Sequence, residues 1–286
     1  MKKSKIALFV VLFLVVLFNL TVAYMDRNMK ERKHEDVYES CHKIWSARGL
    51  YNNHAQQNTL TSMKRAFAQG TMGAEVDLFY DVKMHKFIIT HAGPTKGKNG
   101  ELKYIEKEGE VLTLEKFLRV LGKDHYFWLD YKNHGRLNKK ESFEAIARLE
   151  EITKGTSMKE RLYIEGSNPI LLSLYTDAGF KTIFGIHPHA EDNIFSSIVL
   201  NAYKIGYFFY NITAVAMPYG SIEKPIYADK AEKILKDIPV FLFHVPDDET
   251  LLNSLIRRKE VRVLLAGRDI STDRSSINLC ENNISK

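Results

Sequence analysis

Two carboxylates, Glu75 and Asp77, alternate with Val76 directly after the Gly73-Ala74 pair. If this stretch is a β-strand, side chains two residues apart point to the same face and lie about 7 Å apart. Neighbouring carboxylates repel each other, and proteins usually relieve that repulsion with a divalent cation that takes oxygen ligands. The pair therefore indicates a metal site. The alternative is a solvated edge strand that carries two unrelated acids.

Other charged side chains fall where predicted strands end. Arg48 follows the first strand, His91 closes a hairpin-like extension of the carboxylate strand, and Asp130 and Lys132 end the next strand along the chain. In a barrel of parallel strands, catalytic residues gather at the carboxyl ends of the strands. These four side chains therefore belong to the same candidate site as the carboxylate pair.

The elements that must position these residues alternate regularly between short apolar strands and amphipathic helices. We predict eight strands, the last six at 126–132, 161–166, 181–186, 212–217, 240–244 and 261–266, with helices at 113–121, 139–154, 169–178, 191–205, 228–236 and 248–257. This alternation over about 240 residues predicts a (β/α)8 barrel. The alternative is an open doubly wound sheet, but no glycine-rich phosphate loop follows the first strand.

Length and charge limit the function classes. The chain has 286 residues, of which 45% are hydrophobic and 27% charged, which suits one domain of roughly 250 residues with a terminal segment. The net charge of +6 favours an anionic partner. No nucleic-acid motif accompanies the scattered basic residues, so we expect an acidic small molecule or an anionic membrane surface and no nucleic acid.

The N-terminus is basic and then apolar. Residues 6–23 carry no charge and follow three lysines, which is typical of either a signal peptide cleaved after Ala23 or an uncleaved membrane anchor. We therefore divide the chain into a signal peptide or anchor at 1–23, a tether at 24–40 and a barrel at 41–286. The barrel is expected outside the cytoplasmic membrane, on its periplasmic or extracellular side. In such an oxidising compartment Cys41 and Cys280 could form a disulfide, and two unpaired thiols are the alternative.

The motifs from Ile44 to Lys132 resemble those of the glycerophosphodiester phosphodiesterase family, whose fold is the barrel of phospholipase C-like phosphodiesterases. The matching residues are Ala47-Arg48-Gly49, Gln57-Asn58-Thr59-Leu60, Ala66-Phe67, Gly70, Glu75-Val76-Asp77 and His91. Asp130-Tyr131-Lys132 is similar to the family's Glu-x-Lys motif on the third strand. Beyond Lys132 the resemblance is one of topology alone.

The resemblance implies a phosphodiesterase that holds one divalent metal ion, Ca²⁺ or Mg²⁺. Glu75, Asp77 and Asp130 would be the metal ligands, with Asp130 in place of the family's usual glutamate. Arg48 would bind the phosphate through its planar fork of donors. Lys132 would add positive charge where the transition state becomes more negative.

The chain departs from the family pattern at its proton-transfer residues. The family uses two histidines, and Ala47 stands where the first is expected. His91 matches the second and would be the main proton donor, although Ala92 replaces the aspartate that follows it in the family. His54, in the loop after the first strand, is a candidate substitute for the missing imidazole. His187, His189 and His244 also fall at or just beyond strand ends, where a structural or surface histidine is the simpler interpretation.

Two functions follow from these residues. The first is a membrane-anchored or secreted metal-dependent phosphoric diester hydrolase that acts on glycerophosphodiesters or phospholipid head groups. The second is a catalytically impaired barrel that binds phosphodiesters or an envelope partner. Ala47 is the residue that distinguishes the two functions, because a methyl group transfers no proton. General acid or base catalysis typically contributes about 10²- to 10⁴-fold to the rate.

Overall fold

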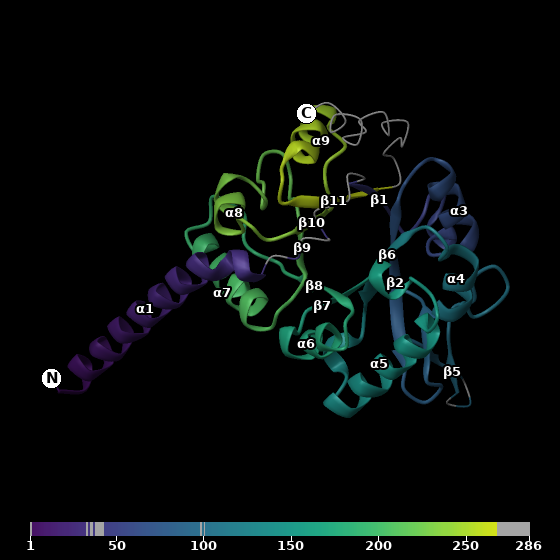
Figure 1. Ribbon diagram of the computed structural model, residues 1–286, viewed down its shortest axis with the longest axis horizontal. Helices are drawn as coiled ribbons and strands as arrows, with labels where there is room; N and C mark the ends of the chain where they lie inside the picture. Colours follow the sequence, from purple (N-terminus) through teal and green to yellow (C-terminus); the bar gives the residue numbers. More distant parts are fainter. Residues whose placement is uncertain are drawn as a thin grey trace.

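The computed structural model describes residues 2–32, 34, 37, 43–97, 99 and 101–267. Within them, eight parallel strands form a closed barrel, in which β1 pairs with both β2 and β11. The strands are β1 (Ile44–Ala47), β2 (Gly73–Asp81), β6 (Tyr126–Tyr131), β7 (Leu162–Gly166), β8 (Lys181–Gly185), β9 (Ala214–Pro218), β10 (Val240–Phe243) and β11 (Val261–Ala266). The predicted (β/α)8 barrel is confirmed, and the open sheet is excluded (Figure 1).

Helices cover the outside of the barrel between successive strands (Figure 1). They are α3 (Leu60–Ala68), α4 (Leu114–Leu121), α5 (Lys139–Thr153), α6 (Pro169–Asp177), α7 (Ser196–Phe209), α8 (Asp229–Ile234) and α9 (Glu249–Arg257). Helix α7 begins later than expected, because Glu191 is held in a loop. The Glu191 backbone N–H donates to the Pro225 carbonyl at 2.9 Å, and the Glu191 side chain accepts from the Lys230 N–H at 2.7 Å.

Strand β2 is longer than its neighbours and continues into a hairpin with the antiparallel β3 (Lys86–Ile89). The chain then makes the small antiparallel pair of β4 (Thr95–Lys96) and β5 (Leu102–Lys103) before it reaches α4. The hairpin returns the chain to the carboxylate strand, because the Thr90 N–H donates to the Asp77 carbonyl at 3.0 Å. His91 therefore directly follows Thr90, the residue whose backbone is hydrogen-bonded to the candidate metal ligand Asp77.

Aromatic side chains fill the inside of the barrel below the candidate site. Trp45, Trp128, Tyr163 and Phe241 are buried there, and their ring centroids lie 5.2–5.8 Å apart in edge-to-face or tilted pairs. Gly73 makes room for one of these rings, since a Cβ at this position would lie 2.5 Å from the Trp45 ring. This close-packed aromatic layer limits the movement of the side chains of the candidate site above it.

The N-terminal helix α1 (Lys2–Asn28) projects away from the barrel (Figure 1). It is long and apolar enough to cross a membrane, as expected for a signal peptide or an anchor. The end of α1 and the residue after it pack on the barrel, because Met25 and Met29 are buried in the same core cluster as residues of α7 and α8, and Asp26 pairs with Lys204. Apolar side chains four residues apart share one helix face, and here that face packs on the barrel.

A 3₁₀ turn at Met29–Arg32 follows α1 and keeps the chain on the barrel surface. The Arg32 guanidinium donates to the Asn211 side chain and lies 5.4 Å from the centre of the Phe208 ring. Residues 38–42 and 268–286 lie outside the described part of the chain, and the Cys41–Cys280 pairing falls there.

A buried histidine behind the barrel wall predicts a pH dependence of stability. His134 is 1% exposed, packs between Tyr131 and Tyr175, and has no hydrogen-bond partner on either ring nitrogen. Burial lowers the pKa of His134 to about 4 from its ordinary 6.5. The unfolded chain therefore takes up this proton at a higher pH than the folded chain does. As the pH falls from 6.5 to 4, His134 should lower the free energy of unfolding by about 3 kcal/mol.

Chemical denaturation of wild type and His134→Phe across this pH range would test the prediction. The loss of stability linked to His134 is absent above pH 6.5 and complete below pH 4. The variant, which has no imidazole there, should therefore lose less stability on acidification. The exposed His189 provides the control, since His189→Phe should keep the wild-type slope. Equal slopes for wild type and His134→Phe would contradict the prediction.

Candidate active site

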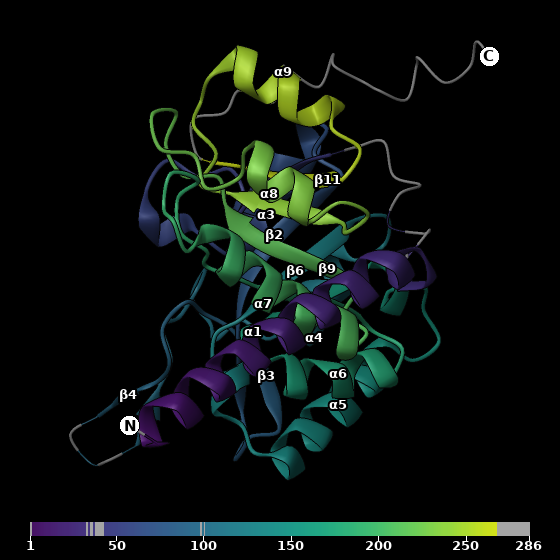
Figure 2. The ribbon, with the colours of Figure 1, turned by 90° about the vertical axis from the view of Figure 1, so that its left-hand side faces the viewer.

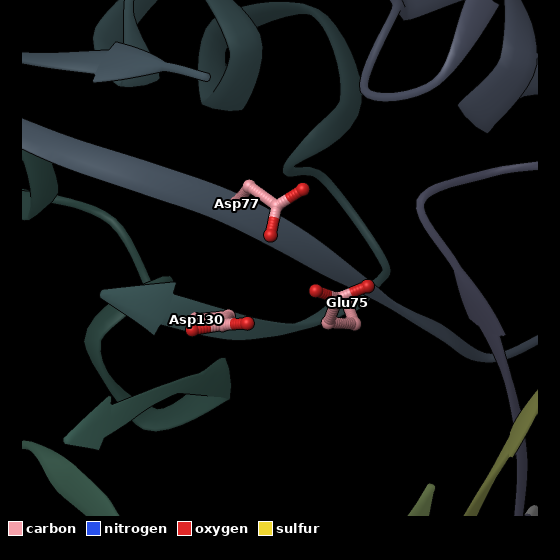
Figure 3. A group of neighbouring side chains, drawn as sticks. All are labelled: Glu75, Asp77 and Asp130. Carbon is pink, nitrogen blue, oxygen red and sulfur yellow. The ribbon is translucent and has the colours of Figure 1, made fainter. Parts of the chain in front are cut away.

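Three carboxylates from two neighbouring strands converge near the carboxyl ends of those strands (Figure 3). Glu75 and Asp77 lie on β2, and Asp130 lies on β6, directly opposite Asp77 in the parallel register. One oxygen of each side chain lies within 4.8 Å of the other two. Glu75 and Asp77 are buried, whereas Asp130 is half-buried. The predicted face-sharing of Glu75 and Asp77 is thus present, and Asp130 completes the cluster.

Two cations lie against this carboxylate cluster. The Arg48 Nε atom is 2.9 Å from Asp77 Oδ2 and 3.7 Å from Glu75 Oε2. The Lys132 Nζ atom is 2.7 Å from Asp77 Oδ1 and also pairs with Asp130. Asp77, which is fully buried, therefore lies between two cations and two other carboxylates.

The loop after β1 holds Arg48 in place through backbone geometry. Arg48 and Asn58 both have left-handed conformations, with φ of 61° and 58°. The Arg48 N–H donates to the Glu75 carbonyl at 3.1 Å, and its carbonyl accepts from the Asn58 N–H at 3.0 Å. Gly49 follows at φ +84°, and a Cβ there would lie 2.4 Å from the Ser62 hydroxyl oxygen. Only glycine adopts this conformation without strain, so the Arg-Gly pair fixes the turn.

Asn58 has a contact role that the sequence motif alone did not reveal. Its side-chain amide donates to Asp77 Oδ2 at 2.7 Å, and its side-chain carbonyl accepts from the Asp77 N–H at 3.1 Å. Thr59 then caps α3, because its hydroxyl accepts from the Ser62 N–H at 3.0 Å. The Gln-Asn-Thr motif thus serves both the carboxylate cluster and the first barrel helix.

The electrostatics of the cluster favour an additional positive charge. Burial, together with repulsion from Asp77 and Asp130, raises the pKa of Glu75 well above its ordinary value. Burial also raises the pKa of Asp130, and Asp77 adds to that effect. The Asp77 Oδ1 atom is buried, and the Lys132 ammonium pairs with it at 2.7 Å. Hard divalent cations prefer such oxygen ligands, so the residues present fit Ca²⁺ or Mg²⁺.

A pocket of about 510 Å³ opens over the cluster at the barrel mouth. Arg48, Glu75, Asp130 and Lys132 line it, and Ala47 contributes only a methyl group where a proton-transfer residue is expected. Three further polar side chains line this pocket, namely Tyr51, Glu165 and His244. Their common signal is a position at or just beyond the carboxyl end of a barrel strand.

The histidines occupy two different places. His187 and His244 line the pocket, and His244 holds a left-handed backbone conformation with φ of 50°. His91 and His54 are exposed and do not line it. His54 Nδ1 lies 3.1 Å from the Gln57 amide nitrogen. The roles expected of His91 and His54 stay predictions.

Glu165 faces the pocket beside the indole of Trp128, whose Nε1–H donates to Glu165 Oε2 at 2.6 Å. Burial raises the pKa of Glu165 to about 8, and the nearby Asp130 carboxylate contributes to the same direction. Gly185 on the adjacent strand leaves space for it, since a Cβ there would lie 2.5 Å from Glu165 Oε1. Burial therefore favours the protonated form of this carboxyl at the rim of the site.

Comparison with solved structures shows the same fold in glycerophosphodiester phosphodiesterases. A Galdieria sulphuraria protein assigned to this class is 14% identical, with a TM-score of 0.60 over 82% of this chain and 96% of its own. A glycerophosphodiester phosphodiesterase from Parabacteroides distasonis is 15% identical, with a TM-score of 0.56 over 84% and 98%. A phosphodiesterase from Oleispira antarctica, solved with the product sn-glycerol-3-phosphate, is 15% identical, with a TM-score of 0.56 over 82% and 96%.

No family model matches the chain, and no curated protein matches it. The structure neighbours are thus glycerophosphodiester phosphodiesterases, and at this level of identity the likeness concerns the barrel.

Proposed function

We propose that the chain is a metal-dependent phosphoric diester hydrolase that acts on glycerophosphodiesters or phospholipid head groups. The observation that carries this proposal is the convergence of Glu75, Asp77 and Asp130 within 4.8 Å of one another, with Arg48 and Lys132 beside them. A phosphodiester is anionic, and this site offers both a cation-binding cluster and two fixed cations. The fold of the structure neighbours supports the same reaction class.

In this proposal each side chain has one task. Glu75, Asp77 and Asp130 hold one Ca²⁺ or Mg²⁺, which when bound supplies positive charge to a phosphoryl oxygen. Arg48 binds the phosphate through its guanidinium, and Lys132 stabilises the negative charge that grows in the transition state. Asn58 orients Asp77 through the paired hydrogen bonds between them. His91 donates the proton to the leaving alkoxide, from a loop that starts beside Asp77.

A second candidate function rests on one observation, the methyl group of Ala47 on the pocket wall. Without a proton acceptor there, the barrel would bind phosphodiesters or an envelope partner and turn them over slowly or not at all. His54 is the predicted substitute, and its side chain lies outside the pocket lining. The domain division into a terminal apolar segment and a barrel outside the cytoplasmic membrane applies to both functions.

The distinguishing experiment measures glycerophosphocholine hydrolysis by the full chain in Ca²⁺, in Mg²⁺ and in excess chelator. We expect turnover that requires the divalent ion and yields sn-glycerol-3-phosphate. Calorimetric titration with sn-glycerol-3-phosphate in the same buffers measures binding independently of turnover. Binding without hydrolysis at high protein concentration would reject the enzyme and support the binding function. The absence of both would reject the enzyme and the binding of phosphodiesters.

A further inference from the structure

The outward face of α7 is apolar along its entire length. Phe195, Ile198, Ala202, Ile205 and Phe209 follow one another at intervals of three or four residues, which places them on one side of a helix. Phe195, Ile198 and Phe209 are 56%, 55% and 53% exposed. The opposite side of α7 is buried in the barrel core. A helix that is apolar on both its buried and its outward side needs a second apolar environment.

The N-terminal helix, which is long and apolar enough to cross a membrane, starts its contacts with the barrel on this same helix. Tyr24 of α1 packs edge-to-face on Phe208 of α7, with ring centroids 6.0 Å apart. Asp26 pairs with Lys204, which also donates to the Ile234 carbonyl at the end of α8. Figure 2 shows α1 passing beside α7 and continuing past the barrel. None of the 18 most apolar residues of α1 is buried, and the contacts of Tyr24 and Asp26 attach this candidate membrane span to α7.

We propose that the outward face of α7 lies in the interface of the bilayer that α1 enters. Because α1 is fixed to α7 by buried side chains and an ion pair, a membrane around the apolar run of α1 would lie next to this face. Tyr24 is 56% exposed at the junction, and tyrosines are enriched at the level of lipid head groups. An apolar helix face that enters the interface contributes binding free energy in proportion to the area it buries.

The placement has a consequence for the site. Helix α7 follows β8, so its first turn lies at the same end of the barrel as the carboxyl ends of the strands, where the pocket opens. Phe195 at this end and Phe209 at the other would both contact lipid. The pocket would then open beside the bilayer surface. This membrane contact does not depend on hydrolysis, and it can be tested in a protein that has no turnover.

Three matched variants of the full chain provide the test. Phe195→Trp and Phe209→Trp place an indole on the α7 face, and Phe143→Trp places one on α5 at a site that is 50% exposed. The native Trp45 and Trp128 are 3% and 1% exposed and give a constant background. Each variant is reconstituted through α1 into phosphatidylcholine vesicles with and without brominated acyl chains, and tryptophan emission is compared.

We expect brominated lipid to quench the added emission of Phe195→Trp and Phe209→Trp, and to leave Phe143→Trp and wild type unchanged. Equal quenching in Phe195→Trp and Phe143→Trp would overturn the proposal. A blue-shifted but unquenched Phe195→Trp would also overturn it, because a second copy of the chain would then cover α7 in place of lipid. Circular dichroism of each variant confirms that the barrel is intact.

Discussion

Asp77→Asn is expected to lower kcat/KM for glycerophosphodiesters by about 10²- to 10³-fold, which is the typical cost of losing one preorganised electrostatic group. Asp77 is fully buried, contacts both Arg48 and Lys132, and receives a hydrogen bond from Asn58. The substitution keeps the shape of the side chain and removes its charge. Calcium or magnesium binding, measured by calorimetry, should weaken in parallel with the loss of activity.

Asp81→Asn is the matched control, because Asp81 is a second buried aspartate on the same strand. It accepts the backbone N–H groups of Lys83 and Met84 in the hairpin turn and the hydroxyl of Tyr104. Its loss should lower stability and leave metal binding and turnover close to wild type. If Asp77→Asn remained as active and as metal-dependent as wild type, the carboxylate cluster would not be the metal site.

His91→Ala should lower kcat by about 10²- to 10⁴-fold, the usual contribution of general acid catalysis, without changing metal affinity. The physical basis is the backbone bond from the Thr90 N–H to the Asp77 carbonyl, which starts the His91 loop beside the cluster. Steady-state kinetics with glycerophosphocholine across pH 5 to 9 would measure the effect.

His244→Ala and His187→Ala are the comparison variants, since both imidazoles line the pocket. We expect each to retain most of the wild-type activity. His54→Ala tests the substitute for the family's first histidine, and activity lost in both His91→Ala and His54→Ala would identify a relocated pair. Activity that survives His91→Ala and disappears in His244→Ala would instead place proton transfer at the seventh barrel strand.

The barrel was predictable because apolar strands and amphipathic helices alternate with few long interruptions, and each period leaves a local signal. The convergence of Asp130 on the β2 carboxylates was predictable for the same reason, since parallel neighbours end at one pole. Contacts that join distant segments left no such signal. The attachment of Asp26 to Lys204 and the hydrogen bond from Trp128 to Glu165 depend on tertiary packing. The local pattern around 24–32 shows charge, whereas its two methionines are buried in the barrel's core cluster.

The short strand β1 is the seam of the barrel, since its four residues pair with β2 on one side and with β11 on the other. Ile44 pairs with Leu264 in this sheet, so the barrel cannot close until β11, its last strand, has been synthesised. Until then the nascent protein exposes two unpaired edges, which are the surfaces most prone to association between chains.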